Sequence, residues 1–250
     1  MTRSLTIDAR YYRLYPRPDM AGYAQESLDL PIDETVFLLV DVYGPYDHEP
    51  VARGLRPAGG ARSVADDHAA IVWERIAPAK AAAARASLRI VYVTNRLRPG
   101  LSAGNEWRTM SARTHGVDVL QTWREPADHL AFSKVISPRR DEPVVEKQVF
   151  SGFFETNLDS VLRGYRARNL IVVGGDGMIC LGTTVIDAMY RNYRIVALRD
   201  GVITNEYPET KADAWASFMA IRQIETAVGY TITTSQFISA CDVAAAGHAS

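Results

Sequence analysis

The stretch IVVGGDGMICLGTTVIDAMY, residues 171–190, decides the fold. It opens on an apolar, β-branched run of the kind that forms a strand buried on both faces of a sheet. Three glycines around Asp176 then predict a turn, and Cys180 opens a segment that predicts a helix. A buried strand, a tight turn and a helix in this order make up the repeating unit of α/β folds.

The same alternation continues on both sides of this stretch. Apolar runs predict five further strands, at 35–41, 88–94, 143–147, 193–200 and 229–238, the last range including the exit from its strand. Helical patterns fall between them at 64–87, 156–169, 179–192 and 208–228, with Pro78 expected to kink or divide the first helix. We therefore predict a three-layer αβα fold with a mostly parallel sheet of about six strands and right-handed crossovers.

The rest of the chain has weaker patterns. Residues 1–34 are rich in Tyr, Pro and Asp without a sustained period, which predicts an extended arm over the body or toward a partner subunit. Residues 95–143 give no clean element and are interpreted as a lid or substrate-facing excursion. No linker divides the chain, so we expect one domain over 35–240 and a short tail over 241–250.

Composition excludes several classes of partner. The chain has 28 basic and 29 acidic residues, which gives no footprint for nucleic acid or for a polybasic membrane anchor. The N-terminus lacks the apolar core of a signal peptide, and no run approaches the length of a membrane span, so the expected location is the cytoplasm. Two cysteines, Cys180 and Cys241, are too few for a disulfide framework and are treated as free thiols.

Reactive side chains stand where the predicted strands end. In a parallel sheet, ligands bind outside the carboxyl ends of the strands. The residues there include Asp41, Asn95, Lys147, the turn before Cys180, and Asp200. A helix N-terminus and a nearby cation both stabilise a thiolate, so we expect the pKa of Cys180 to be lowered. An adjacent carboxylate can carry the proton and the turn amides can stabilise an oxyanion, which together indicate acyl transfer through a thioester.

Each signal also has an ordinary structural explanation. A cysteine behind a buried strand packs as a small core residue, and an aspartate that ends a strand is a turn former. The turn also fits a dinucleotide fingerprint in which Gly175, Gly177 and Cys180 take the three small positions and Asp200 binds a ribose. A nicotinamide-dependent oxidoreductase therefore stands as an alternative function.

The order of these residues resembles the isochorismatase-like cysteine hydrolases over residues 35–240. The acid follows LLVDVY, the lysine opens KQVFSGFFETNLDSVLR and the cysteine ends IVVGGDGMIC. Together with GNEWRTM and RQIETAVGY, these segments resemble the ureidoacrylate amidohydrolases most. The resemblance implies a triad of Asp41, Lys147 and Cys180, and a small ureido or carboxamide substrate, including carbamoyl- or biuret-like compounds. It also implies a homo-oligomer, dimer or tetramer, in which the arm is a candidate contact.

The resemblance implies further site residues. The amides of Asp176 and Cys180 would form the oxyanion hole, after a cis peptide between Gly175 and Asp176. Asn95, Asn105 and Phe150 match positions that line the substrate pocket, where amides and an aromatic ring suit a planar ureido group.

The chain also departs from the family pattern. Its first strand ends in Asp41-Val42-Tyr43-Gly44 rather than Asp-Met-Gln, and Asp176 replaces a usual alanine. The five histidines are scattered, and His48 is the one nearest the predicted rim, so we predict no catalytic metal and no cofactor. A family member without catalysis that acts through protein contacts is the remaining alternative.

Overall fold

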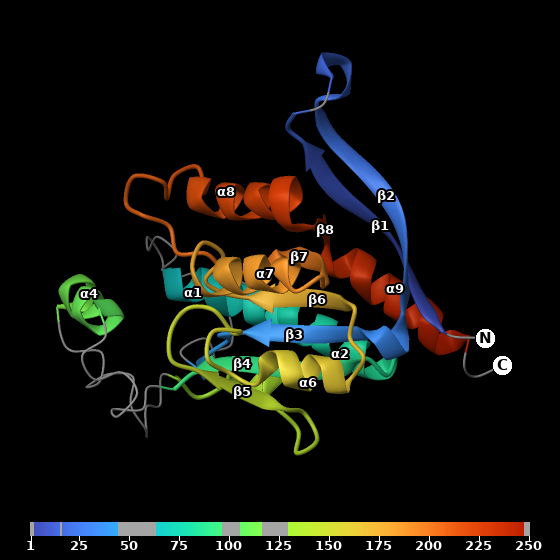
Figure 1. Ribbon diagram of the computed structural model, residues 1–250, viewed down its shortest axis with the longest axis horizontal. Helices are drawn as coiled ribbons and strands as arrows, with labels where there is room; N and C mark the ends of the chain where they lie inside the picture. The colour runs from blue at the N-terminus through green and yellow to red at the C-terminus, as the bar shows by residue number, and fades with distance from the viewer. Residues whose placement is uncertain (1–2, 16, 45–63, 97–105, 117–129, 248–250) are drawn as a thin grey trace, which may run out of the picture.

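The computed structural model describes residues 3–15, 17–44, 64–96, 106–116 and 130–247. Its centre is one eight-stranded sheet with the strand order β2-β1-β8-β7-β6-β3-β4-β5. The six parallel strands are β3 (Thr35–Val40), β4 (Arg89–Asn95), β5 (Val144–Lys147), β6 (Asn169–Gly174), β7 (Arg194–Val202) and β8 (Tyr230–Ile232). Figure 1 shows them side by side with their carboxyl ends toward one edge. The mostly parallel α/β prediction is confirmed.

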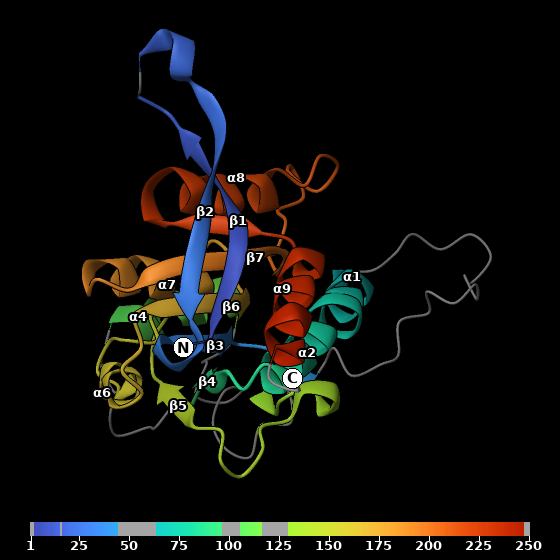
Figure 2. The ribbon, with the colours of Figure 1, turned by 90° about the vertical axis from the view of Figure 1, so that its right-hand side faces the viewer.

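Helices cover both faces of this sheet, as Figure 2 shows. One face carries α1 (Val64–Ile71), α2 (Ala77–Arg85) and α9 (Thr234–Ala246), whose apolar side chains join one buried cluster with the sheet. The other face carries α6 (Leu158–Gly164), α7 (Cys180–Tyr190) and a π-helical turn at Ile224–Val228, which join a second cluster. The remaining helices are α4 (Glu106–His115) and α8 (Trp215–Gln223). None of the described helices is both long and apolar enough to cross a membrane.

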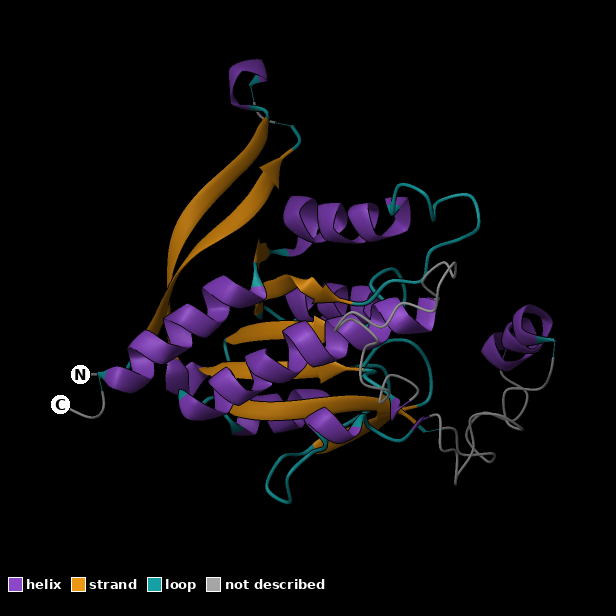
Figure 3. Cartoon of the chain, turned by 180° about the vertical axis from the view of Figure 1, so that it is seen from behind, coloured by secondary structure: helices purple, strands orange, loops and turns teal. Residues whose placement is uncertain are grey.

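The N-terminal segment differs from the expected arm, and it raises the strand count from about six to eight. Strands β1 (Ser4–Arg13) and β2 (Gly22–Pro31) form an antiparallel hairpin, and β1 joins the sheet beside β8. Leu5 and Leu30 are fully buried, so the base of the hairpin belongs to the core. Its far end extends beyond α8 (Figure 3). Buried and exposed residues alternate in β1 only from Leu5 to Ala9, and the four residues after Ala9 are all half-exposed, so the alternating stretch is short.

The first helix is divided near Pro78 as the sequence predicts, whereas the last strand is shorter than predicted. The π-helical turn at Val72–Ile76 divides the first helix just before Pro78, because the amide of Ala77 donates to Val72 rather than to the carbonyl four residues back. The last strand ends at Ile232, and α9 then runs into the range predicted as a tail. A capping box of Thr233 and Gln236 starts that helix.

Candidate active site

Three parallel strands deliver the candidate triad to one edge of the sheet. Asp41 follows β3, Lys147 ends β5, and Cys180 is the first residue of α7, which follows β6. Asp41 has a φ of 48°, in the left-handed region that non-glycine residues rarely adopt, while its amide donates to Val93. The chain therefore turns out of the strand at Asp41, and such backbone conformations cluster at functional sites.

Asp41 and Lys147 form a buried ion pair. The Lys147 Nζ lies 2.7 Å from Asp41 Oδ2, and the exposed fractions of the two side chains are 0% and 4%. A buried ion pair needs further hydrogen bonds because each charge has lost its water. In this site, the side chains of Asn95 and Tyr43 form the further hydrogen bonds with the ion pair.

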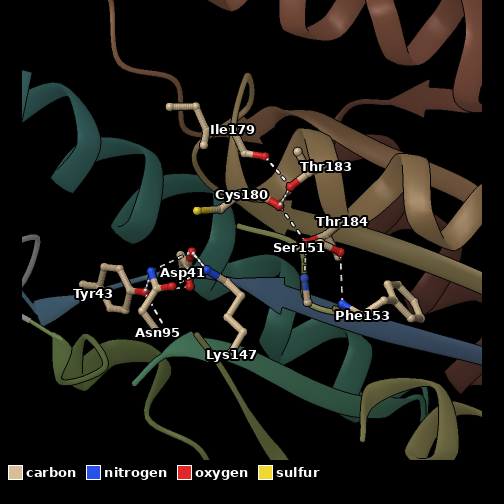
Figure 4. A network of polar contacts seen from close by, with 11 residues as sticks. Asp41, Tyr43, Asn95, Lys147, Ser151, Phe153, Ile179, Cys180, Thr183 and Thr184 are labelled. Atoms are coloured by element: carbon tan, nitrogen blue, oxygen red, sulfur yellow. Dashed lines mark hydrogen bonds and ion pairs between the residues drawn. The ribbon is translucent and has the colours of Figure 1, made fainter. Parts of the chain in front are cut away.

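Asn95 and Tyr43 supply those hydrogen bonds. The Asn95 amide oxygen accepts from Lys147 at 2.5 Å, and its nitrogen donates to Asp41 Oδ2 at 3.2 Å and to the Tyr43 hydroxyl at 2.8 Å. Tyr43 in turn donates to Asp41 Oδ1 at 2.6 Å. Figure 4 shows these side chains gathered on one side of the Cys180 sulfur. Asn95, expected to line the substrate pocket, thus has its amide engaged within the network.

The Cys180 thiol is protonated in this environment. Burial, followed by the negative charge of Asp41, raises its pKa to about 12, although Lys147 acts in the opposite direction. The expectation of a lowered pKa is therefore wrong for the free site, because desolvation and the carboxylate outweigh the cation. Asp41 and Lys147 therefore act on the thiol in opposite directions, the carboxylate raising its pKa and the ammonium group lowering it. A thiol in this state needs a proton acceptor before it can attack, and Asp41 is beside it.

The turn before Cys180 leaves two amides unused. The peptide between Gly175 and Asp176 is cis, as the family resemblance implied. The Asp176 carbonyl accepts from the amides of Ile179, Leu181 and Gly182 at 3.1, 2.9 and 3.4 Å. Among the described residues, the amides of Asp176 and Cys180 have no hydrogen-bond acceptor. Two free amides beside a thiol are what an oxyanion hole requires.

The Asp176 carboxylate has hydrogen-bond donors of its own in and beside the turn. Its Oδ1 accepts from the Met178 amide at 2.7 Å, and its Oδ2 accepts from the amide and the side chain of Asn205, both at 2.8 Å. These three donors stabilise the charge within the turn. Asp176 therefore fastens the turn to the segment that follows β7.

The first turn of α7 is also fastened to the loop after β5. Thr184 donates its hydroxyl proton to the Cys180 carbonyl at 2.6 Å and accepts from the Gly152 amide at 2.9 Å (Figure 4). Ser151 hydrogen bonds with Asp187 on the same helix. These contacts fix the nucleophile candidate relative to the loop that begins at Lys147.

The other predicted site residues have different surroundings. Phe150 is half-buried in the loop after β5, and its ring meets Trp107 of α4 edge to face at 6.0 Å. Asn105 and His48 lie outside the described residues. Within the described ranges, no group of three or more His, Cys, Asp or Glu side chains could hold a metal ion.

The glycine turn before Cys180 is unlike a dinucleotide-binding loop. A Cβ on Gly177 would lie 2.4 Å from Thr204 Oγ1, so this glycine packs against protein. Asp200, the candidate for a ribose contact, instead accepts from the amide and hydroxyl of Thr234 at 2.7 and 2.8 Å at the start of α9. The geometry favours the oxyanion interpretation of the turn.

Comparisons with known proteins show the family to which the chain is similar. The model of the isochorismatase domain matches residues 55–236. A ureidoacrylate amidohydrolase, RutB, from Methylorubrum extorquens is 28% identical over 230 residues, which cover 86% of each chain. The matched regions include the strands and turns that carry Lys147 and Cys180.

Solved structures share the fold. A cysteine hydrolase from Pseudomonas syringae pv. phaseolicola superposes with a TM-score of 0.70 at 24% identity and covers 86% of this chain and 95% of its own. N-carbamoylsarcosine amidase from Thermoplasma acidophilum gives a TM-score of 0.56 at 23% identity, with 80% and 96% covered. At these identities the similarity concerns the fold.

Proposed function

The chain belongs to the isochorismatase family, and from this premise we propose that it is a cysteine-dependent amidohydrolase acting on a small amide or ureido compound. One observation carries the proposal. Asp41 and Lys147 form a buried pair close enough for both charges to act on the thiol of Cys180, and the amides of Asp176 and Cys180 have no acceptor among the described residues. A nucleophile, a proton acceptor and oxyanion donors are the parts that acyl transfer needs.

The first half of the reaction forms a thioester. Asp41 takes the thiol proton as the sulfur of Cys180 attacks the carbonyl carbon of the substrate, and the carbonyl oxygen becomes an oxyanion. The amides of Asp176 and Cys180 donate to that oxygen, and each well-placed donor is worth about 3 to 4 kcal/mol. The C–N bond then breaks, and Asp41 returns the proton to the departing nitrogen. Ammonia or the substituted amine leaves, according to which C–N bond is cleaved; where the amine leaves, the group left on sulfur is a carbamoyl group, which the second half releases as carbamate.

The second half restores the thiol. Asp41 accepts a proton from water, the oxygen of which attacks the thioester carbon. The same two amides bind the second oxyanion. When the C–S bond breaks, the proton passes from Asp41 to the sulfur of Cys180, and the acid product leaves. Lys147 keeps the Asp41 carboxylate in place through their ion pair in both halves.

The RutB relative supports ureidoacrylate as the first substrate to try, and the shared fold of N-carbamoylsarcosine amidase supports carbamoyl compounds. The aromatic pair of Phe150 and Trp107 near the end of β5 could cover a planar conjugated amide. We also propose that the protein works in the cytoplasm and forms a homo-oligomer. Light scattering on the purified protein tests the oligomeric state directly.

The test of the activity is a substrate panel. Ureidoacrylate, N-carbamoylsarcosine, biuret and nicotinamide, followed by larger amides, are incubated with the protein, and ammonia and carbamate release is measured. Cys180→Ala is expected to abolish turnover. Cys241→Ala is the matched control, because Cys241 is also a fully buried thiol but lies in α9 among apolar core residues.

The outcomes separate the proposals. Release that depends on Cys180 and is retained in Cys241→Ala supports the hydrolase. Saturable binding of NAD(H), with an activity indifferent to Cys180→Ala, would point to the oxidoreductase. Absence of any Cys180-dependent product across the panel would refute the hydrolase and favour a member without catalysis.

A further inference from the structure

The Tyr43 hydroxyl is fixed in direction by its three partners. It accepts from the backbone N–H of Asn95 at 3.1 Å and from the side-chain nitrogen Nδ2 of Asn95 at 2.8 Å, and both of these groups can only donate. The two lone pairs of the hydroxyl are therefore used. Its single proton can point only to Asp41 Oδ1, which lies 2.6 Å away.

The Asp41 carboxylate has about four positions at which it can accept a hydrogen bond. Lys147 and Asn95 occupy Oδ2 at 2.7 and 3.2 Å, and Tyr43 occupies one position on Oδ1. The second position on Oδ1 has no donor among the described residues and is open to the thiol of Cys180. With three donors in place the carboxylate cannot rotate without losing at least one of them, so its orientation toward the sulfur is set.

We propose that Tyr43 is a positioning residue that holds the Asp41 carboxylate in the orientation that receives the Cys180 proton. This inference rests on the proposed function, because it assigns Tyr43 a part in the proton transfer of that reaction. The hydrogen bonds of the Tyr43 hydroxyl go to Asp41 and Asn95, so Tyr43 acts on the thiol through Asp41. It occupies the position where the family pattern usually has glutamine.

Tyr43 keeps its proton at every pH at which the enzyme would work. Burial, then the charge of Asp41 and the hydrogen bond to it, raises the pKa of Tyr43 well above its ordinary value. The hydroxyl is therefore a permanent donor to the carboxylate. Donation to a charged acceptor is stronger than donation to a neutral one, and loss of such a bond is felt by the charged group.

The test is Tyr43→Phe, with Tyr193→Phe as the matched control. Tyr193 also donates its hydroxyl to a carboxylate, Asp159 Oδ1 at 2.8 Å, but at the far end of α7. On the best substrate of the panel, we expect kcat of Tyr43→Phe to fall about 10- to 100-fold, the range for one charged hydrogen bond, with KM changed much less. The acidic limb of the pH profile of kcat/KM should move to higher pH, because the carboxylate loses a donor that favours its charged form.

A second readout does not need a substrate. Alkylation of Cys180 by iodoacetamide at pH 8 reports the thiolate fraction. Without the Tyr43 donor, more of the Asp41 charge faces the sulfur, so Tyr43→Phe is expected to alkylate several-fold more slowly than the parent protein and Tyr193→Phe at the parent rate. An unchanged or faster alkylation rate in Tyr43→Phe would overturn the inference, as would an unshifted pH profile. Failure of the whole panel with slowed alkylation would refute the hydrolase alone.

Discussion

Removal of Lys147 should cost the fold as well as the reaction. At 2.7 Å, and with an effective dielectric constant of about 20, the attraction to Asp41 is worth roughly 6 kcal/mol. Lys147→Met keeps most of the side-chain volume and leaves the Asp41 charge buried, where its remaining donors among the described residues are Tyr43 and Asn95. We therefore expect the free energy of unfolding to fall by about 3 to 5 kcal/mol, the usual cost of breaking a buried pair.

Urea unfolding of four proteins measures this cost. The set is the parent, Lys147→Met, Asp41→Asn and the double variant. The double variant removes both charges, so its loss should be at least about 1.5 kcal/mol smaller than the sum of the two single losses. Lys80→Met is the control for an ion pair away from the site, because Lys80 pairs with Glu142 at 3.2 Å with similarly low exposure. It should lose stability but keep Cys180-dependent turnover. A loss below about 1 kcal/mol in Lys147→Met, or additive losses, would refute the reasoning.

Three further predictions concern the thiol, the turn and helix α8. The folded state raises the pKa of Cys180 to about 12 from an ordinary 9, so the stability that the protonated thiol contributes is present below pH 9 and lost between pH 9 and 12. In urea titrations from pH 9 to 11, Cys180→Ala should therefore lose less stability than the parent protein. Asp176→Ala removes the acceptor of three hydrogen bonds and should lower the free energy of unfolding by about 1 to 3 kcal/mol and reduce turnover, with Asp176→Asn less affected. Burial raises the pKa of Glu206, but four donated hydrogen bonds outweigh it and bring that pKa down to about 2. The stability that Glu206 contributes is therefore present above pH 4.5 and lost as the pH falls toward 2. The urea midpoints of the parent and Glu206→Gln should converge over that range, and a constant gap would contradict the assignment.

The parallel core of the fold could be predicted from the sequence because its strands are buried on both faces. Runs such as TVFLLV have no polar interruption, so their pattern is strong. The hairpin of β1 and β2 was missed because its strands are buried only near the base, where Leu5 and Leu30 enter the core. The capping box of Thr233 and Gln236 is a sequence signal for the start of α9. The signal is hard to recognise because the residues directly before it have the pattern of a strand.

The shared position of the candidate site residues at one edge of the sheet could be predicted from the sequence, but the electrostatics at the thiol could not. Strand ends placed Asp41, Lys147 and Cys180 at one edge, since register in a parallel sheet brings such ends together. The balance between burial and neighbouring charge at the thiol depends on distances that a sequence does not contain. Tyr43 was noted only as a departure from the family pattern. Its place two residues after Asp41 is the available signal, but the left-handed turn at Asp41, which brings the two side chains together, is not visible in the sequence.

The most direct test of the account is the intact mass of the protein during turnover. The protein is mixed with ureidoacrylate, or with the best substrate of the panel, quenched in acid within milliseconds to seconds and weighed by mass spectrometry. We predict a transient mass increase equal to the acyl part of the substrate, located on Cys180 by peptide mapping, absent in Cys180→Ala and present in Cys241→Ala. Turnover without any covalent adduct on Cys180, or with full activity in Cys180→Ala, would contradict the thioester mechanism.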